Sequence, residues 1–306
     1  MEKKNNLMIP IYKRILHFLW LNFIKTNKNK LNGLSIIIFS KDRPLQLDGL
    51  LRSFLENIEG NYQLIIQWNS TSKEFDKAYY EIFENYNNII YKNIKEKQFK
   101  ADLINSIEET EFPNLMFLVD DILFVSKFNI SWLNTINLKK VVPSIRLWPG
   151  INYTQPSETY SPPPVIVPFS INPWRLFSWT ESNGYWSMPL SVDGNIFEKS
   201  EILFLLKKAD FKAPNSLEKA FGPYRFIYKR RKGICLENPV ILNFALNRVN
   251  TENTDFACGE DYSPEKLLEL WNQNQRIDIN KMKEIDSNSC HIICTPIFIN
   301  SKLIKE

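Results

Sequence analysis

The sequence predicts an α/β protein with a mostly parallel central sheet flanked by helices. Short apolar runs alternate with segments whose apolar residues recur at helical spacing, and polar loops follow the runs. One run, residues 115–119, leads without a break into two adjacent carboxylates, Asp120 and Asp121. Such an alternation gives parallel strands with right-handed crossovers, and a ligand site at the carboxyl ends of the strands.

The first half of the chain carries this alternation most clearly. The predicted strands are residues 34–39, 62–68, 88–91 and 115–119, and the predicted helices are residues 45–55, 75–86 and 99–107. Pro44 follows a polar loop and suits the first turn of a helix. No G-x-G-x-x-G follows the first strand and no P-loop motif occurs, so dinucleotide-binding and P-loop interpretations lose their main support.

The second half has a different texture. Residues 142–189 are rich in Pro, Trp, Tyr and Ser without a regular period. These rings either stack on the apolar faces of sugars or fill a second core, and we expect roughly half of them to be core. Helices are also predicted at residues 199–208 and 263–271. Between them, a capping signature that includes Ser216 predicts another helix. The basic residues 226–232 are predicted to form a solvated loop.

Composition bounds the function classes. With 306 residues and 44% hydrophobic content, the chain can form one large α/β domain or two small ones. A net charge of +4 with scattered basic residues gives no argument for nucleic acid, and suits an anionic small molecule or a membrane surface. Cys235, Cys258, Cys290 and Cys294 are expected to be reduced thiols of a cytoplasmic protein, because the sequence shows no secretory signal.

The N-terminal residues allow two interpretations. Residues 9–24 are apolar, but Lys13, Arg14 and His17 interrupt them, so the uninterrupted part is too short to span a bilayer. With its basic flanks, the segment 9–30 either lies as an amphipathic helix on the inner face of the membrane or packs on the domain.

Asp120 and Asp121 are unsuited to a core position, because burying each unpaired charge would cost several kcal/mol. They require a cation. Hard divalent ions such as Mg²⁺ and Mn²⁺ bind carboxylate oxygens and still accept phosphate oxygens. The pair therefore predicts a metal–diphosphate site, with capping of a turn as the alternative.

Taken together, the buried strand ending in Asp-Asp, the βα units before it and the loop from Ser40 to Pro44 resemble the nucleotide-sugar glycosyltransferases of the GT-A fold. Residues 191–197, 214–218 and 247–249 resemble uncharacterised, family-2-like bacterial members found in surface-polysaccharide clusters. The resemblance covers about residues 34–295. It implies a Rossmann-like nucleotide-diphospho-sugar transferase fold that uses Mn²⁺ or Mg²⁺. The donor would be a nucleoside-diphosphate sugar and the acceptor a saccharide or glycan, with no nucleic-acid partner.

The resemblance also implies a division of the chain. An N-terminal extension, residues 1–32, would precede a single domain at residues 33–300. Within that domain, residues 33–125 would bind the nucleotide sugar and residues 126–300 the acceptor.

Site residues follow from the same resemblance. Asp121 would bind the metal directly, Asp120 would contact the ribose or the metal through water, and His291 would complete the metal shell. A structural His, or a zinc site formed with Cys290 and Cys294, are the alternatives for His291.

The donor and the acceptor each have candidate residues. Ser40, Asp42 and Asn69 lie where the fold holds the nucleoside, and Arg43 would pair with phosphate. In an inverting reaction a carboxylate takes the proton of the acceptor hydroxyl, and Glu218 and Asp193 are the candidates. The plain alternatives are a charge at a helix N-terminus for Glu218 and an Asp-Gly turn for Asp193.

Two other functions remain open on the sequence. A sugar nucleotidyltransferase also needs a metal and a diphosphate, but usually carries a Gly-rich loop after the first strand, and residues 40–47 contain no Gly. A non-catalytic carbohydrate-binding or assembly protein would use the aromatic segment and would tolerate loss of Asp121.

Overall fold

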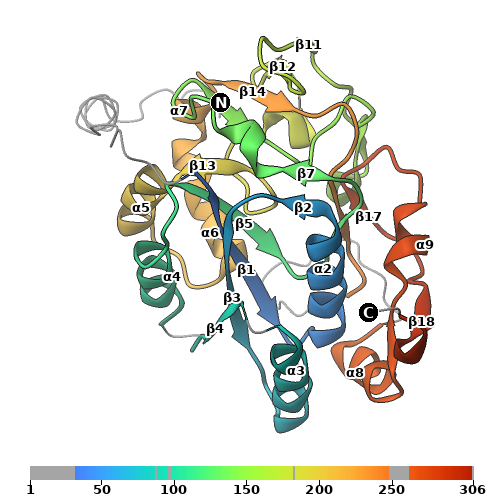
Figure 1. Cartoon of the computed structure of the whole chain (residues 1–306). Helices are drawn as coiled ribbons and strands as arrows, with labels where there is room; N and C mark the ends of the chain where they lie inside the picture. Colours follow the sequence, from blue (N-terminus) through green and yellow to red (C-terminus); the bar gives the residue numbers. More distant parts are fainter. Residues whose placement is uncertain (1–31, 87, 96–97, 182, 248–261, 305–306) are drawn as a thin grey trace, which may run out of the picture.

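The computed structural model describes residues 32–86, 88–95, 98–181, 183–247 and 262–304 (Figure 1). The predicted N-terminal extension, with its membrane contact at residues 9–30, and Cys258 lie outside these ranges. Within them, every helix is too short or too polar to cross a membrane.

A five-stranded sheet forms the centre of the molecule, in the order β13-β5-β1-β3-β4. Its strands are β1 (Leu34–Lys41), β3 (Tyr62–Asn69), β4 (Ile90–Asn93), β5 (Asn114–Val119) and β13 (Ile196–Glu198). Only β13 runs antiparallel to its neighbour, so the predicted, mostly parallel sheet is confirmed. The register pairs Lys41 with Asn69 and Phe39 with Val119, which brings the polar ends of three strands to one edge.

Helices cover both faces of this sheet. On one side lie α2 (Pro44–Asn57) and α3 (Lys73–Asn85), and on the other lie α4 (Phe99–Glu108) and α5 (Lys199–Lys208) (Figure 1). Pro44 begins α2, as expected for a residue without an amide N–H at the first helical position. Ser72 caps α3 by accepting a hydrogen bond from the Phe75 amide at 3.4 Å.

A smaller sheet extends β5 beyond the aspartate pair. It has the order β17-β15-β6 and consists of β6 (Ile122–Phe124), β15 (Ile241–Phe244) and β17 (His291–Ile292). Because β6 starts directly after Asp121, this sheet brings Asn243 and His291 to the same end of β5.

The aromatic segment packs into the same hydrophobic core as the central sheet. It contributes to a four-stranded sheet of β8 (Val141–Pro143), β11 (Val167–Pro168), β12 (Arg175–Ser178) and β14 (Lys232–Cys235). Trp174, Trp179 and Trp186 are each at most 1% exposed, so they fill this core, whereas Tyr160 is 72% exposed. The core interpretation therefore holds for the tryptophans.

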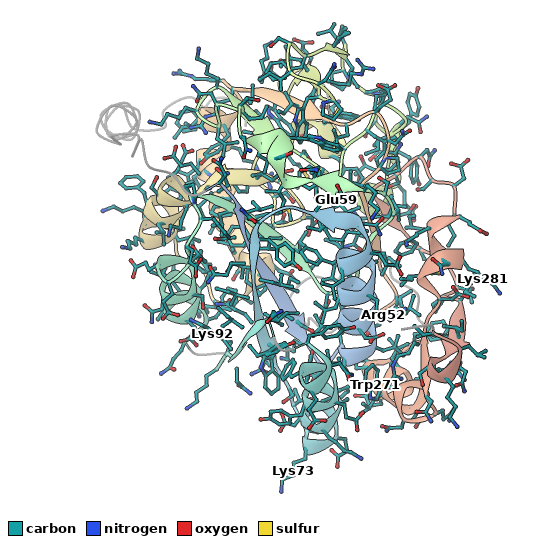
Figure 2. All side chains as sticks on the ribbon, in the orientation of Figure 1. Arg52, Glu59, Lys73, Lys92, Trp271 and Lys281 are labelled. Atoms are coloured by element: carbon teal, nitrogen blue, oxygen red, sulfur yellow. The ribbon has the colours of Figure 1, made fainter. Side chains whose placement is uncertain are left out.

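The remaining elements are short or lie on the C-terminal side of the molecule. They are α6 (Pro214–Phe221), α7 (Arg225–Tyr228), α8 (Pro264–Asn272), α9 (Ile279–Lys283), β2 (Ile58–Glu59), β7 (Phe128–Asn129), β9 (Tyr153–Thr154), β10 (Thr159–Tyr160), β16 (Gln275–Ile277) and β18 (Phe298–Asn300), with 3-10 turns at Ile130–Leu133, Gln155–Ser157, Gly184–Ser187, Gly222–Tyr224 and Ser301–Leu303. Figure 2 shows Arg52 on α2 and Trp271 on α8. Arg52 donates to the Ile277 carbonyl at 2.8 Å, which ties α2 to this C-terminal side.

One local prediction was wrong. Residues 226–232 are not a solvated loop, because they lie partly in α7 and β14 and because Arg231 is buried in an ion pair with Glu201. The predicted capping role of Ser216, in contrast, is confirmed. Helix α6 begins at Pro214, and the Ser216 hydroxyl reaches back to accept from the Ala213 amide at 2.8 Å.

Candidate functional site

A pocket of about 970 Å³ opens at the carboxyl ends of β1, β3 and β5. Phe39, Phe99 and Phe211 line it as one aromatic wall, with ring centroids 5.6 and 6.0 Å apart. The lining also includes polar and charged residues, among them Ser40, Lys41, Arg43, Asn69, Lys100, Asp120 and Lys212. The pocket therefore combines an apolar wall with a cationic rim, and one carboxylate of the aspartate pair borders it.

The loop after β1 is fixed by hydrogen bonds to its neighbours. Asp42 has a φ of 53°, a left-handed conformation that Asp tolerates better than most residues. Its carboxylate accepts from the Thr71 amide at 2.8 Å, which ties the loop to the end of β3. The Ser40 hydroxyl lies 2.7 Å from the hydroxyl of Tyr79, which also accepts from the Arg43 amide at 3.1 Å. These bonds hold Arg43 above the end of β5.

The guanidinium of Arg43 contacts both carboxylates of the aspartate pair. Its Nη1 donates to Asp120 Oδ1 at 3.0 Å and to Asp121 Oδ2 at 3.2 Å. Its Nη2 donates to the carbonyl of Asn247, and its Nε is buried without a hydrogen-bond partner. The second oxygen of Asp121 accepts from Asn243 Nδ2 at 2.8 Å. The cation that these carboxylates require is therefore supplied, in this structure, by Arg43.

Burial still dominates the titration of the pair. It raises the pKa of Asp120 to about 6, although Arg43 opposes the shift. Burial likewise raises the pKa of Asp121, against the effect of Arg43. Asp193 and His291 also perturb the pKa of Asp121, which places all three side chains within electrostatic range of one another.

A second cluster surrounds Asp193. Its Oδ2 lies 3.2 Å from Arg146 Nη1 and 3.6 Å from His291 Nε2. Burial alone would raise the pKa of Asp193, but His291 and Arg146 hold it below its usual value. Burial alone would lower the pKa of His291, but Asp193 and Cys290 raise it to about 10. Tyr185 lies between the two cations, stacked on the His291 ring at 5.2 Å and 5.3 Å from the Arg146 guanidinium.

Glu218 supports the loop that carries Asp193. One carboxylate oxygen accepts from the Ser191 hydroxyl at 2.8 Å and from the Val192 amide at 3.0 Å. The loop then turns at Gly194, whose φ of +75° favours glycine, before β13 begins. Glu218 thus acts on the position of Asp193 through two hydrogen bonds.

The donor types at this edge suit a hard divalent ion. Asp120 and Asp121 supply carboxylate oxygens. His291 could add its imidazole only after losing the proton that its raised pKa favours. Across the residues that the structure describes, however, no group of three or more His, Cys, Asp and Glu side chains is placed to hold a metal ion. The same finding applies to zinc at His291 with Cys290 and Cys294, three residues that all lie in the described ranges.

The structure gathers most of the predicted site residues. Ser40, Arg43, Asn69 and Asp120 line one pocket, while Asp42 braces the loop beside it. Asp121, Asp193 and His291 form a second group, within electrostatic range of one another.

The sequence did not predict three residues of the site, Arg146, Tyr185 and Asn243. Arg146 and Tyr185 lie in the aromatic segment, and Asn243 lies in an apolar stretch, so their surroundings suggested core rather than chemistry. A polar side chain within a short apolar run is the signal that could have indicated Arg146 and Asn243, which are both buried in the structure.

No protein-family model matches the chain. Over 112 residues, 34% of this chain, it is 35% identical to the protein described as bifunctional glycosyltransferase pgtA of Dictyostelium discoideum. The chain spans only 14% of the length of that relative.

Solved structures of S. aureus TarS show a partial likeness. TarS 1-349 matches with a TM-score of 0.42 at 12% identity, over 68% of this chain and 59% of that one. Its complex with UDP-GlcNAc gives 0.41 at 13% identity, over 68% and 57%. Neither the fold nor the site described above depends on this likeness.

Proposed function

We propose that the protein is a glycosyltransferase that moves a sugar from a nucleoside-diphosphate sugar to a saccharide or glycan acceptor. The observation that carries the proposal is the 970 Å³ pocket at the carboxyl ends of β1, β3 and β5, bordered by Asp120 of the aspartate pair. Open α/β sheets bind ligands at this edge, and the volume suits a ligand of nucleotide-sugar size. The partial identity to a protein named as a glycosyltransferase supports the same class.

The lining of the pocket suits a nucleoside diphosphate. The aromatic wall of Phe39, Phe99 and Phe211 offers an apolar surface to a base, and Ser40 and Asn69 offer hydrogen bonds to the nucleoside. Lys41, Lys100 and Lys212 give the lining a positive charge that attracts a diphosphate. Arg43 borders both the pocket and the aspartate pair, so a phosphate in the pocket lies within its reach.

A divalent cation, Mn²⁺ or Mg²⁺, completes the proposal. Asp121 would hold it directly, with Asp120 and, once its imidazole has lost a proton, His291 as supporting ligands, and it would neutralise charge that develops on the leaving diphosphate. The carboxylates of Asp120 and Asp121, which both contact the Arg43 guanidinium, support a cation at this position.

Asp193 is the residue that we propose as general base. A base must stay ionised at neutral pH, and Arg146 and His291 keep the pKa of Asp193 low. The Glu218 oxygen that bonds Ser191 and Val192 already has two donors, so we assign Glu218 to positioning the Asp193 loop.

The tryptophans argue against the alternative of a carbohydrate-binding protein that uses the aromatic segment. Trp174, Trp179 and Trp186 are buried, so their rings are not available to stack on a sugar. Among the described residues, no structural feature favours a sugar nucleotidyltransferase.

We place the reaction in the synthesis of a bacterial surface polysaccharide, in the cytoplasm, with the segment 9–30 as a peripheral contact at the inner face of the membrane. The basic character of that segment and the resemblance of residues 191–197 and 214–218 support this assignment. Cys235, Cys290 and Cys294 form no disulfide, in keeping with a reducing compartment.

Calorimetric titration tests the proposal directly. The wild type and Asp121→Ala are titrated with UDP, GDP and CDP, each with and without Mn²⁺. We expect one nucleotide to bind in a metal-dependent manner and that binding to vanish in Asp121→Ala. If none of the nucleotides binds the wild type, the protein is not a nucleotide-sugar transferase.

A further inference from the structure

Arg43 occupies the position at which a divalent ion would neutralise the aspartate pair. Its guanidinium lies 3.0 Å from Asp120 and 3.2 Å from Asp121, and all three side chains are at least 88% buried. The Asn247 carbonyl holds it from the opposite side. An ion that binds both carboxylates must therefore compete with this side chain.

The contact is weaker than a forked arginine–carboxylate pair. In a fork, two N–H groups of the guanidinium meet the two oxygens of one carboxylate. Here a single nitrogen, Nη1, serves both aspartates, and Nε is buried with no hydrogen-bond partner. A buried donor without a partner carries a desolvation penalty. The arrangement thus leaves Arg43 with an unused donor that a phosphate oxygen could satisfy.

The charges at the site favour binding of a divalent ion together with an anion. The ionised pair carries −2, and Arg43 reduces this to −1. A divalent ion added beside Arg43 would leave +1 in a buried site, which is costly unless an anion enters as well. A diphosphate in the adjacent pocket supplies that anion, and Arg43 already lines the pocket.

We propose that Arg43 is an internal counter-ion that occupies the cation position of Asp120 and Asp121 in the free protein and turns to the donor diphosphate when a divalent ion binds. This inference rests on the proposed function. Its consequence is cooperative binding: the metal binds weakly without nucleotide, and the nucleotide binds weakly without metal.

The test is metal binding rather than activity. Mn²⁺ is titrated into the full-length protein by calorimetry, with and without saturating UDP, in the wild type and in Arg43→Met. Arg52→Met is the matched control. Like Arg43, Arg52 pairs with a carboxylate, Asp48 at 2.9 Å, and donates to a backbone carbonyl. It lies on α2 (Figure 2), and its side chain is 14% exposed, against 12% for Arg43. Thermal unfolding of each variant, and a further variant Arg43→Lys, separate a folding defect from a binding effect.

In the wild type and in Arg52→Met, we expect UDP to tighten Mn²⁺ binding by about tenfold or more. In Arg43→Met, Mn²⁺ should bind about tenfold more tightly than in the wild type without UDP, and UDP should add little. Arg43→Lys should fall between the two. The inference is overturned if the wild type binds UDP and Mn²⁺ independently, or if folded Arg43→Met binds Mn²⁺ no more tightly than the wild type. A wild type that binds no nucleotide contradicts the proposed function itself.

Discussion

Asp193 lies on the loop that Glu218 holds, and the two carboxylates have different partners. Arg146 and His291 face the carboxylate of Asp193, whereas Glu218 accepts its hydrogen bonds from the loop itself. Asp193→Asn should lower kcat by about 10²–10⁴-fold, the range of general-base catalysis, with nucleotide affinity unchanged. Glu218→Gln should cost far less than Glu218→Ala, because an amide oxygen can still accept both bonds. Steady-state kinetics with calorimetric UDP binding checks both effects. Equal losses in Asp193→Asn and Glu218→Gln would contradict these roles.

The buried Asp120 carboxylate lowers the stability of the folded protein at neutral pH. Its folded-state pKa of about 6 lies above the ordinary value of 3.8 for an aspartate side chain, so the folded protein binds this proton more tightly than the unfolded chain does. This carboxyl group therefore lowers the free energy of unfolding as pH rises from about 4 to 6. In EDTA, Asp120→Asn should be more stable relative to the wild type at pH 8 than at pH 4.5, by on the order of 1–3 kcal/mol. Urea unfolding at the two pH values measures the difference. Asp210→Asn, at an exposed side chain, serves as the control, and a difference independent of pH would contradict the burial argument.

At the scale of elements, the turn before β13 positions the loop that carries Asp193. Gly194 has a φ of +75°, and a Cβ there would lie 2.4 Å from Ile241 Cδ1. Gly194→Ala should therefore cost on the order of 1–3 kcal/mol of stability and displace Asp193, with a loss of kcat. Gly222→Ala is the control: its φ of −46° is helical and nothing lies within 4 Å of a Cβ there, so it should be neutral or stabilising. Denaturant unfolding and kinetics of both variants test this, and equal behaviour of the two would refute it.

The sequence was most informative where structure is local. Residues 199–208 were predicted as a helix and form α5 with the same limits, and the strands at residues 34–39 and 62–68 were each extended by only one or two residues. A single hydrophobic period or a single apolar run carries the information for such elements.

Elements that depend on long-range pairing could not be predicted in this way. The contact of Asn243 with Asp121 joins residues 122 positions apart through β6 and β15, which have three and four residues. Arg231 shows the same limit, because its burial depends on Glu201 and not on the basic run around it. Nor did the sequence indicate that Arg43 would pair with Asp120 and Asp121, since it was expected to pair with phosphate.

For the whole molecule, one hydrophobic core joins the two halves of the chain. The contiguous core includes Ile37 of the central sheet, Ile234 of the second sheet and Ile277 on the C-terminal side. We therefore expect residues 33–300 to unfold as one cooperative unit, in keeping with the predicted single domain.

Ligand binding should then stabilise this unit as a whole, because a ligand that binds only the folded state shifts the equilibrium by mass action. UDP with Mn²⁺ at about 100 times Kd should add about 2.7 kcal/mol and raise Tm by several degrees. Differential scanning calorimetry, compared with near-UV circular dichroism, tests this on the wild type, with Asp121→Ala as the variant that should not respond. Two separate transitions, of which the ligands move only one, would show that residues 33–125, the half predicted to bind the nucleotide sugar, fold independently of residues 126–300.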